Sequence, residues 1–373
     1  MKQFLTGFIA LALFSACAPE IPLTVDQTGP IVIGAIGALT GEGAPYGLLT
    51  QQTAKIRVDQ INAAGGINGR NLELIWEDGK CNGGDASRAA QKLIGVNKVS
   101  IIFGGVCSGE TLGVAPITEK KKVILLSSIS SSAEITDAGD YVFRTYPSDS
   151  NQGKVLAAYA SKNFKKVGIL VEQTDYAVAL ADVFTQEFSG EVVIETFLTT
   201  ESDFRTRITK MKNMDLDALF VNANTPNKTS IIYKQLAEQE WDTPLLGNEW
   251  ILNNKDVTSQ NAEFIAAREG VGAEFSTDTD REDYQRFSVK YEAEFGAKPE
   301  LDNYAATTLD AIDILAKVLG RVDDVTDTDA IRDELHKISH EGFSGLVEFD
   351  ANGDVRGAHT LFQFNGTEFI PVS

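Results

Sequence analysis

Residues Phe103 to Thr111, with the sequence FGGVCSGET, combine side chains and glycines that could support three kinds of chemistry. The segment follows an apolar run and precedes a stretch with helical spacing, so Cys107 and Ser108 stand at the end of a predicted strand. A cysteine or serine on such a turn could be a nucleophile, and a glycine-rich turn before a helix could bind a phosphate. A serine at a helix N-terminus could instead hold the carboxylate of a ligand without any reaction.

The nucleophile alternative lacks its usual partners in this sequence. The residues VCSGE do not match the G-x-S-x-G pattern of a nucleophile elbow, and the histidines that could act as a base all lie near the C-terminus. The segment HKISH places His336 and His340 on one face of a predicted, solvated helix, and it lacks the glutamate of the H-E-x-x-H motif. His359 falls in a predicted hairpin, where we expect a structural role. A Ser–Lys or Cys–Asp pair stays open, but the sequence favours a protein that is not an enzyme.

The phosphate alternative depends on glycine spacing. Residues Gly34 to Gly43, GAIGALTGEG, follow a predicted strand but match neither G-x-x-x-x-G-K-[ST] nor a G-x-G-x-x-G that opens a helix. These glycines instead allow a loop to turn tightly or to approach a ligand closely. Cys81 and Cys107 are too few for a structural zinc site, which takes four ligands. We therefore expect no nucleotide, metal or other cofactor.

The third alternative, a site that only binds a ligand, agrees with the positions of several polar residues. Ligands of parallel α/β sheets lie at the carboxyl ends of the strands, near helix N-termini. Ser108 follows one predicted strand, and the hydroxyl-rich segment 127–136, SSISSSAEIT, follows the next, so both could hold an anion. Glu249 follows a strand of the second half and would suit an ammonium group. Taken one at a time, these residues could also be ordinary helix caps or a surface glutamate.

The elements that must position these residues alternate between strands and helices along the chain. The strands are apolar without polar alternation, which is typical of a parallel sheet covered on both faces. We predict strands at residues 31–37, 72–77, 99–104, 122–128, 165–171, 192–198, 218–224 and 243–249. Helical spacing predicts helices at residues 45–64, 86–95, 151–163, 177–188, 202–213, 226–239, 281–296 and 302–319. The segment 345–364 predicts an antiparallel hairpin that turns at an Asn-Gly pair.

With 373 residues, the chain is long enough for two domains with separate cores. The βα pattern runs in two blocks, and the change of pattern near residues 143–153 predicts a crossover between them. We predict an α/β fold of two Rossmann-like lobes with parallel sheets, joined by short hinge crossovers. Lobe 1 takes residues 30–148 and 275–345, and lobe 2, with the hinge, takes residues 149–274 and 346–373.

The N-terminus predicts export and a lipid anchor. Lys2 precedes the apolar run from Phe4 to Phe14, which is too short for a membrane span. The following FSAC resembles a lipobox, with phenylalanine in place of the usual leucine. We therefore predict a signal peptide over residues 1–17, lipidation of Cys17 and a tether over residues 18–29. Plain secretion is the alternative, and nothing after this segment predicts a transmembrane span.

The charge and the remaining cysteines limit the partners and the compartment. The net charge of −20 disfavours nucleic acid and anionic membrane surfaces as partners, because both need basic patches on the protein. Two cysteines, Cys81 and Cys107, are left after Cys17. In an exported protein, such a pair most often forms a disulfide.

Several motifs, in this order, resemble the periplasmic binding proteins of branched-chain amino acid ABC transporters, which are type I two-lobe solute receptors. The resemblance runs from about Pro30 to Phe369. Its motifs are IVIGAIGALTGEGAPYG, INAAGGINGRNLELIWEDGKC with the signature Gly-Gly-Ile-x-Gly-Arg, GGVCSGET, LSSISSSAEIT, QTDYAVAL, GNEW and GLVEFDANGD. The resemblance implies a binding protein that closes its two lobes on a small ligand and delivers it to a membrane permease. We expect a monomer.

The resemblance also implies a role for each site residue. Ser108 and Ser131 would hold the α-carboxylate of an amino acid. The backbone carbonyl of Ile129 and the carboxylate of Glu249 would hold its ammonium group. Three tyrosines would line the space for the ligand's side chain: Tyr46, Tyr176 and Tyr304.

Two residues depart from the family pattern. Asn224 stands where the branched-chain receptors tend to have a tyrosine, and Trp250 stands where they have a small residue after the glutamate. Both bear on the second-lobe wall of the pocket, so we expect an amino acid, branched-chain or related, without fixing its side chain. A sensor of the same fold for an amide or another small carboxylate is the alternative. By the same resemblance, Cys107 would pair with Cys81 close to the ligand.

Overall fold

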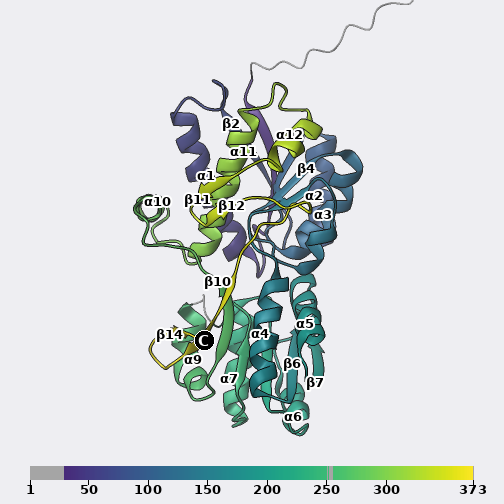
Figure 1. Cartoon of the computed structure of the whole chain (residues 1–373), viewed down its shortest axis with the longest axis vertical. Helices are drawn as coiled ribbons and strands as arrows, with labels where there is room; N and C mark the ends of the chain where they lie inside the picture. Colours follow the sequence, from purple (N-terminus) through teal and green to yellow (C-terminus); the bar gives the residue numbers. More distant parts are fainter. Residues whose placement is uncertain (1–28, 250, 252–254, 373) are drawn as a thin grey trace, which may run out of the picture.

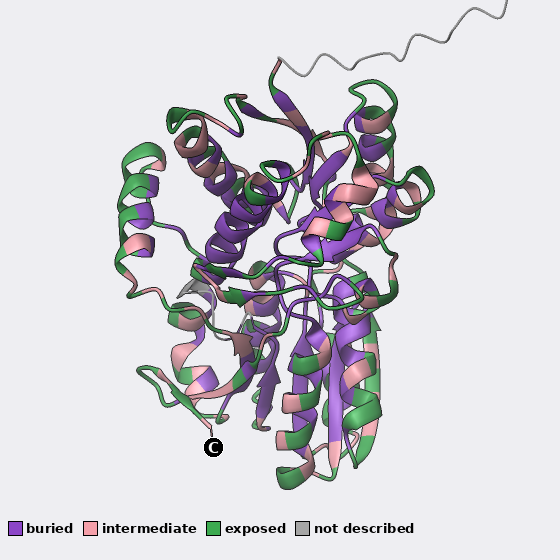
Figure 2. Ribbon diagram, turned by 45° about the horizontal axis from the view of Figure 1, so that its top comes forward, coloured by how far each residue is buried: buried purple, intermediate pink, exposed green. Residues whose placement is uncertain are grey.

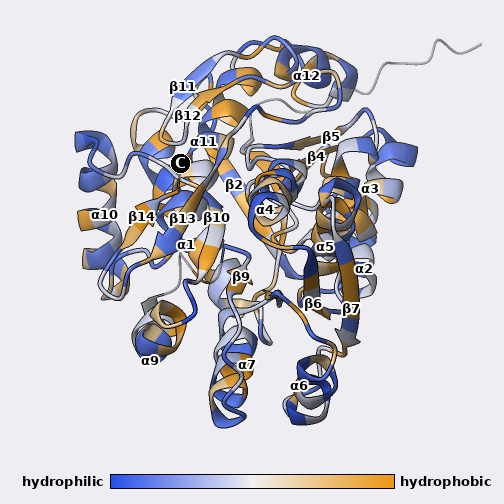
Figure 3. Ribbon diagram, turned by 60° about the horizontal axis from the view of Figure 1, so that its bottom comes forward, coloured by the Kyte–Doolittle hydropathy of each residue, from blue (hydrophilic) through white to orange (hydrophobic). Residues whose placement is uncertain are grey.

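The computed structural model describes residues 29–249, 251 and 255–372 and shows two lobes, one above the other in Figure 1. Each lobe has its own sheet with helices on both sides (Figure 1). Buried residues concentrate in the strands and on the inner faces of the helices, whereas the outer faces are exposed (Figure 2). Figure 3 shows the same division as hydrophobic strands against largely hydrophilic outer surfaces. The α/β fold predicted from the strand pattern is therefore confirmed.

The first lobe is built on a parallel sheet in the order β2-β1-β3-β4-β5. Its strands are β1 (Ile31–Gly37), β2 (Leu72–Asp78), β3 (Ile101–Gly104), β4 (Ile124–Ser127) and β5 (Val142–Arg144). Its helices are α1 (Ala44–Ala63), α2 (Gly83–Gly95), α3 (Ser108–Lys121), α10 (Glu282–Phe295), α11 (Asp302–Leu319) and α12 (Thr328–Leu335). The strands are apolar without alternation because α1 and α11 cover one face of the sheet and α2 and α3 cover the other.

The second lobe is built on a sheet in the order β14-β13-β10-β9-β8-β6-β7. Its strands are β6 (Lys166–Glu172), β7 (Glu191–Phe197), β8 (Ala218–Asn222), β9 (Leu245–Gly247), β10 (Val271–Phe275), β13 (His359–Phe364) and β14 (Phe369–Pro371). Its helices are α4 (Asp149–Asn163) and α5 (Asp175–Glu187) on one face, and α6 (Arg205–Lys212), α7 (Pro226–Glu238) and α9 (Lys255–Ala266) on the other. Strands β6 to β10 are parallel, whereas β13 and β14 run antiparallel to their neighbours.

Within the described residues, the chain passes between the lobes at three crossovers. It leaves β5 of the first sheet for α4, returns from β10 to α10, and crosses again between β12 (Gly345–Val347) and β13. From the sequence, residues 346–355 were predicted to belong to lobe 2 with the hinge. In the structure, Val347, Phe349 and Val355 from this segment pack in the hydrophobic core of the first lobe.

The strands and helices expected from the sequence are present close to their predicted bounds, but the hairpin predicted at residues 345–364 is wrong. Strand β12 pairs with β11 (His340–Gly342), whereas β13 pairs with β10 in the other sheet. Among the described residues, the two arms share the isolated bridge between Phe349 and Val355. The Asn-Gly turn is real, but the arms separate because the chain crosses to the second lobe just after it.

The solvated helix predicted for HKISH is also wrong. Helix α12 ends at Leu335, so His336 caps that helix and His340 lies in β11 with only 4% of its surface exposed. Asp310 of α11 lies 3.4 Å from His340 Nε2 and accepts hydrogen bonds from two backbone N–H groups of the loop after β11. The packing of β11 and the following loop onto α11 therefore determines the conformation of this segment. His359 is buried in β13, and burial lowers its pKa to about 4, which agrees with a structural role.

A buried ion pair fastens the last crossover to the first lobe. The side chain of Arg144, at the end of β5, is fully buried, with Nε 2.6 Å from Asp354 Oδ1 and Nη2 2.8 Å from Asp354 Oδ2. The guanidinium also donates to the carbonyl of Ser132 and the hydroxyl of Thr136. The backbone N–H of Arg144 donates to the carbonyl of Gly353. Because each of the three guanidinium nitrogens donates to an acceptor, the burial of this charge is tolerated.

The predicted signal peptide, the lipidation site Cys17 and the tether lie outside the described residues, and so does Trp250. In the part of the chain that the structure describes, no helix is both long and apolar enough to span a bilayer.

Candidate ligand-binding site

A small cavity between the lobes is lined by eight of the site residues predicted from the sequence: Tyr46, Ser108, Ile129, Ser131, Tyr176, Asn224, Glu249 and Tyr304. Val106 and Cys107 complete the lining. The cavity has a volume of about 30 Å³, which is room for about two water molecules. Most of the lining follows the carboxyl ends of β3, β4, β6, β8 and β9, which is where ligands of parallel sheets bind.

On the first-lobe side, two loops are held together by buried hydroxyl groups. Gly104 has a φ of +120°, and a Cβ there would lie 2.0 Å from the carbonyl oxygen of Ile36, so this position requires glycine. Ser127 and Ser130 donate hydrogen bonds to the carbonyl of Gly105 at 2.7 and 2.9 Å. These bonds fix the loop after β4 against the loop after β3.

The N-terminus of α3 faces this cavity through Ser108. Ser108 is the first residue of the helix and is buried, and its Oγ accepts a hydrogen bond from the backbone N–H of Ser132 at 3.1 Å. That bond leaves the hydroxyl proton of Ser108 available to donate to another acceptor. Ser131 lies beside it in the loop after β4 and is equally buried. Hydroxyl donors at a helix N-terminus favour an anion, because the helix dipole is positive there.

The predicted disulfide between Cys81 and Cys107 is present, with Cα atoms 5.2 Å apart. The carboxylate of Glu110, which is fully buried, lies next to it. Its Oε1 accepts the backbone N–H of Cys81 at 2.9 Å, and its Oε2 accepts the N–H groups of Val106 and Cys107 at 2.9 and 3.0 Å. One side chain thus satisfies three backbone donors on both sides of the disulfide. The bond and the carboxylate together hold the start of α3 beside the cavity.

Glu249 is the charged side chain among the ten described residues that line the cavity, and 2% of its surface is exposed. Its Oε1 accepts a hydrogen bond from the hydroxyl of Tyr304 at 2.7 Å, and its Oε2 accepts one from the hydroxyl of Tyr146 at 2.8 Å. Burial raises the pKa of the Glu249 carboxyl, and the two phenol hydrogen bonds oppose that rise. A cationic group in the cavity would therefore meet a carboxylate whose charge no lining residue neutralises.

Tyr146 is a functional residue that the sequence reasoning missed. It lies on the crossover from β5 to α4, with 1% of its surface exposed, and orients Glu249 without lining the cavity. Asn303 donates to its hydroxyl oxygen at 3.2 Å, and its ring packs edge-on against Tyr304 with centroids 5.3 Å apart. The signal that could have found it is the predicted crossover at residues 143–153, because a hinge lies next to a cleft between lobes.

The three predicted tyrosines form an aromatic wall. The rings of Tyr46 and Tyr304 meet edge to face with centroids 6.2 Å apart. Tyr176, from α5, is buried, and its hydroxyl has no hydrogen-bond partner among the described residues. Burial, followed by the negative charge of Glu249, raises the pKa of all three phenols well above the usual value. The three hydroxyl groups therefore stay protonated; that of Tyr304 donates to Glu249, and that of Tyr176 is available to donate to a ligand.

Asn224 makes the second-lobe wall polar. Its backbone N–H donates to Glu172 Oε2 at 2.7 Å, and its side-chain Nδ2 lies 3.7 Å from Cys81 Sγ in the other lobe. Burial raises the pKa of the Glu172 carboxyl, while the hydrogen bond from Asn224 and the charge of Lys228 oppose that rise. An amide therefore faces the disulfide across the cleft.

Asp149, the first residue of α4, makes the stability of the fold depend on pH. It is 1% exposed, and its Oδ2 has no hydrogen-bond partner among the described residues. Burial, and then the charge of Glu249, raise its pKa from 3.8 to about 8. Between those values the folded state holds a proton that the unfolded state has lost. The contribution of this group to stability is therefore complete at low pH and is lost as the pH rises through about 8.

We expect the melting temperature to fall between about pH 5 and about pH 8, and Asp149→Asn to flatten that slope, because asparagine cannot ionise. The loss in the unaltered protein is at most about 1.4 kcal/mol per pH unit from this group. Thermal denaturation of both proteins across this range tests the prediction. The exposed Asp59→Asn should keep the original slope, and an Asp149→Asn slope equal to it would contradict the assignment.

This chain is similar to proteins of known sequence over most of its length. A family described as periplasmic binding protein matches residues 30–367. A leucine-, isoleucine-, valine-, threonine- and alanine-binding protein of Pseudomonas aeruginosa is 25% identical over 335 residues, which is 87% of each chain. An amino acid binding protein of the same species is 26% identical over 265 residues, which is 69% of this chain and 70% of the relative.

Solved structures agree in fold. The branched-chain amino acid transporter substrate binding protein of Streptococcus pneumoniae, in complex with isoleucine, is 30% identical. The match covers 92% of this chain and 100% of the other, with a TM-score of 0.77. A solute binding protein of an ABC transporter from R. palustris, in complex with benzoate, is 19% identical and shares the fold, with a TM-score of 0.79 over 92% of this chain and 96% of the other.

The two-lobe α/β fold, the lined cavity between the lobes and the match over residues 30–367 agree with one another. The matching family consists of exported solute-binding proteins, which agrees with the expectation of a protein that is not an enzyme. This chain belongs to the family of periplasmic binding proteins that serve ABC transporters as solute receptors.

Proposed function

We propose that this protein binds an α-amino acid, branched-chain or related, in the cavity between its lobes and delivers it to an ABC permease. The observation that carries this proposal is the pairing of two opposite features across one cavity. The start of α3, with the hydroxyl of Ser108, favours an anion, and the buried carboxylate of Glu249 favours a cation. An α-amino acid carries both charges one carbon apart.

The proposed contacts follow from the lining. Ser108 and Ser131 would donate to the α-carboxylate, while the backbone carbonyl of Ile129 and the carboxylate of Glu249 would accept from the ammonium. Tyr46, Tyr176, Asn224 and Tyr304 would surround the side chain. Trp250, which lies outside the described residues, is proposed beside them on the sequence alone.

Closure of the lobes would complete the site. Residues 30–148 with 275–345 would act as one lobe, joined by residues 346–355, which pack in its core, and residues 149–274 with 356–373 would act as the other. The contacts with the carboxylate belong to the first lobe and Glu249 to the second, so the ligand would hold the two together. Burying a zwitterion is costly unless both charges are matched, so closure would select amino acids over ligands with one charge.

Glu249 argues against an aromatic acid as the ligand. The fold alone does not decide the ligand, since a structure of the same fold contains benzoate. A benzoate in this cavity would bring a second negative charge close to a buried carboxylate whose hydrogen-bond partners among the described residues are two phenols. The S. pneumoniae relative, whose structure contains isoleucine, supports the amino acid.

The N-terminus would place this receptor at a membrane surface. We propose that residues 1–17 are a signal peptide, that Cys17 carries a lipid anchor and that residues 18–29 form a tether to the first lobe. The receptor would act as a monomer and present its closed form to the permease. Mass spectrometry of the mature N-terminus tests the anchor, and a free Cys17 or a chain that starts after it would contradict it.

A thermal-shift and calorimetry screen tests the binding proposal. A ligand that binds only the folded state at a concentration 100 times its Kd stabilises the protein by about 2.7 kcal/mol. We expect a rise in melting temperature with leucine, isoleucine, valine or a related amino acid, and none with benzoate or with simple amines. A shift with benzoate and none with any amino acid would overturn the proposal.

A further inference from the structure

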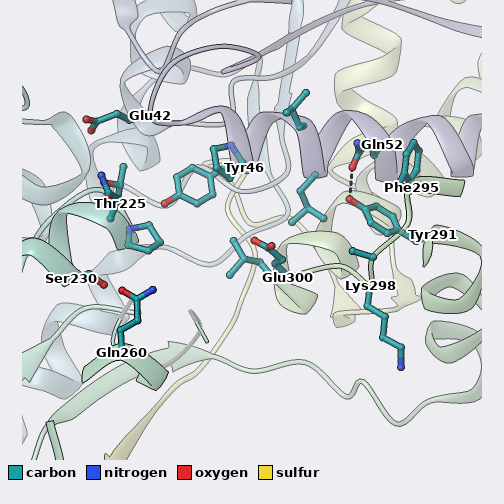
Figure 4. A pocket seen from close by; sticks show the side chains of 17 residues that line it. Glu42, Tyr46, Gln52, Thr225, Ser230, Gln260, Tyr291, Phe295, Lys298 and Glu300 are labelled. Atoms are coloured by element: carbon teal, nitrogen blue, oxygen red, sulfur yellow. Dashed lines mark hydrogen bonds between the residues drawn. The ribbon is translucent and has the colours of Figure 1, made fainter. Parts of the chain in front are cut away.

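A second and much larger cavity lies at the mouth of the same cleft, and we call it the mouth cavity (Figure 4). Its volume is about 510 Å³, within the range of about 300–1,000 Å³ that is usual for small-molecule sites. Its lining comes from both lobes. The first lobe supplies α1, the end of α10 and the loop before α11. The second lobe supplies the start of α7 and part of α9.

Tyr46 is the residue that lines both cavities. In the second lobe, the two cavities are lined by consecutive residues: Asn224 lines the small cavity, and Thr225 lines the mouth cavity. Figure 4 shows the Tyr46 ring extending from α1 toward Thr225. The two cavities therefore adjoin at the ring of Tyr46.

The two volumes are very different. The small cavity, at about 30 Å³, holds the groups that match an ammonium and a carboxylate but has no space for a long side chain. The large volume within reach of those groups lies past Tyr46. The walls of that volume are partly apolar, with Leu49, Leu301 and Tyr291 each about 5–6% exposed. Its rim is polar, with Glu42, Gln52 and Glu300.

We propose that the mouth cavity receives the side chain of the ligand, so that the protein takes α-amino acids with side chains longer than that of leucine. The ligand's charged groups lie at the small cavity, Tyr46 turns aside, and an extended or aromatic side chain packs on Leu49, Tyr291 and Leu301. A polar end to that side chain would meet Glu300 or Gln52 at the rim. This inference rests on the proposed binding of an α-amino acid.

The chemistry of the walls supports this class of side chain. An apolar side chain leaves water when it enters between Leu49, Leu301 and Tyr291, and each buried CH₂ contributes about 0.8 kcal/mol. The hydroxyl of Tyr291 already donates a hydrogen bond to Gln52 (Figure 4). The part of Tyr291 left to contact a ligand is therefore its apolar ring. Lys298 is the cationic residue among the described residues that line the cavity, and its side chain extends away from the other labelled side chains (Figure 4).

A homologous series of amino acids tests the proposal. Calorimetry with 2-aminobutyrate, norvaline, norleucine and 2-aminooctanoate changes only the side-chain length. We expect the unaltered protein to bind 2-aminooctanoate at least as tightly as norvaline. Ser230→Phe, which fills the mouth cavity from α7, should weaken 2-aminooctanoate by about tenfold or more and leave 2-aminobutyrate unchanged. Asn227→Trp, one turn earlier on the same helix, provides a second variant that fills the cavity.

The control is Lys234→Phe, one turn further along α7 at an exposed position outside the cavity lining. It should bind the whole series as the unaltered protein does. If the unaltered protein binds 2-aminobutyrate and norvaline but rejects 2-aminooctanoate, the inference is wrong and the proposed function stands. The same holds if Ser230→Phe and Asn227→Trp weaken every member equally. If no amino acid binds, the proposed function fails and the inference fails with it.

Discussion

Glu249→Gln is expected to weaken the binding of an α-amino acid by about 30-fold or more, because it removes the carboxylate that, among the described lining residues, would face the ligand's ammonium group. Glutamine keeps the length of the side chain. Its single carbonyl oxygen can replace only one of the two carboxylate oxygens that accept hydrogen bonds from Tyr304 and Tyr146. Since the buried carboxyl of Glu249 has a raised pKa, its removal should not lower the stability of the fold. Isothermal titration calorimetry and a melting curve measure the two effects separately.

The matched control is Glu292→Gln, which removes one exposed carboxylate on α10 and should leave affinity unchanged. An affinity within about threefold of the unaltered protein in Glu249→Gln would place the ammonium elsewhere. A large loss of affinity together with a lower melting temperature would mean that Glu249 acts mainly through its two tyrosine partners. The calorimetric and thermal measurements together separate these outcomes.

Asp354→Ala is expected to cost about 3–5 kcal/mol of folding free energy, the largest stability effect that the structure predicts. The change leaves the guanidinium of Arg144 buried without its counter-charge, and the hydroxyl of Thr136 loses the carboxylate to which it donates at 2.7 Å. The side chain of Arg144 has no exposed surface in the folded protein. Denaturant unfolding of the two proteins, with the midpoint and slope compared, measures the loss.

The exposed pair between Lys55 and Asp59 provides the comparison. Asp59→Ala also breaks an ion pair, with atoms 2.8 Å apart, but both side chains are about half exposed. Water and salt screen this pair, so the expected loss is about 0.5 kcal/mol or less. Equal losses in Asp59→Ala and Asp354→Ala would show that the burial of Arg144 is not what makes its partner important.

Much of the fold could be predicted because each strand and helix has a strong local pattern. The run from Ile31 to Gly37 is apolar throughout and is a strand, and residues 302–319 have helical spacing over the whole of α11. The segment HKISH shows the limit of this reasoning. Its spacing would suit a helix, but His340 is drawn into β11 by contacts with α11, which lies far away in sequence. No local pattern records such a contact.

The candidate site could be predicted for a related reason. Ser108, Ser131 and Glu249 each follow an apolar strand, so the carboxyl ends of parallel strands bring them to one edge of each sheet. Tyr146 follows β5, a short strand that was not predicted from the sequence, and its contact with Glu249 exists only because the two lobes meet. The mouth cavity could not be predicted from the sequence either, because its walls come from helices of both lobes and depend on how those helices are spaced.

The order of the elements has a consequence for the newly made chain. All strands of the first sheet are synthesised by residue Arg144, but one face of that sheet is covered by α11 and α12, which are made only after the whole parallel part of the second sheet. While residues 145–301 are made, a growing chain thus carries the strands of this sheet with that apolar face covered by α1 but not yet by α11 and α12. Such a surface attracts other chains, and contacts between distant segments form slowly. We therefore expect this sheet face to be a binding surface for chaperones until α11 and α12 have been made.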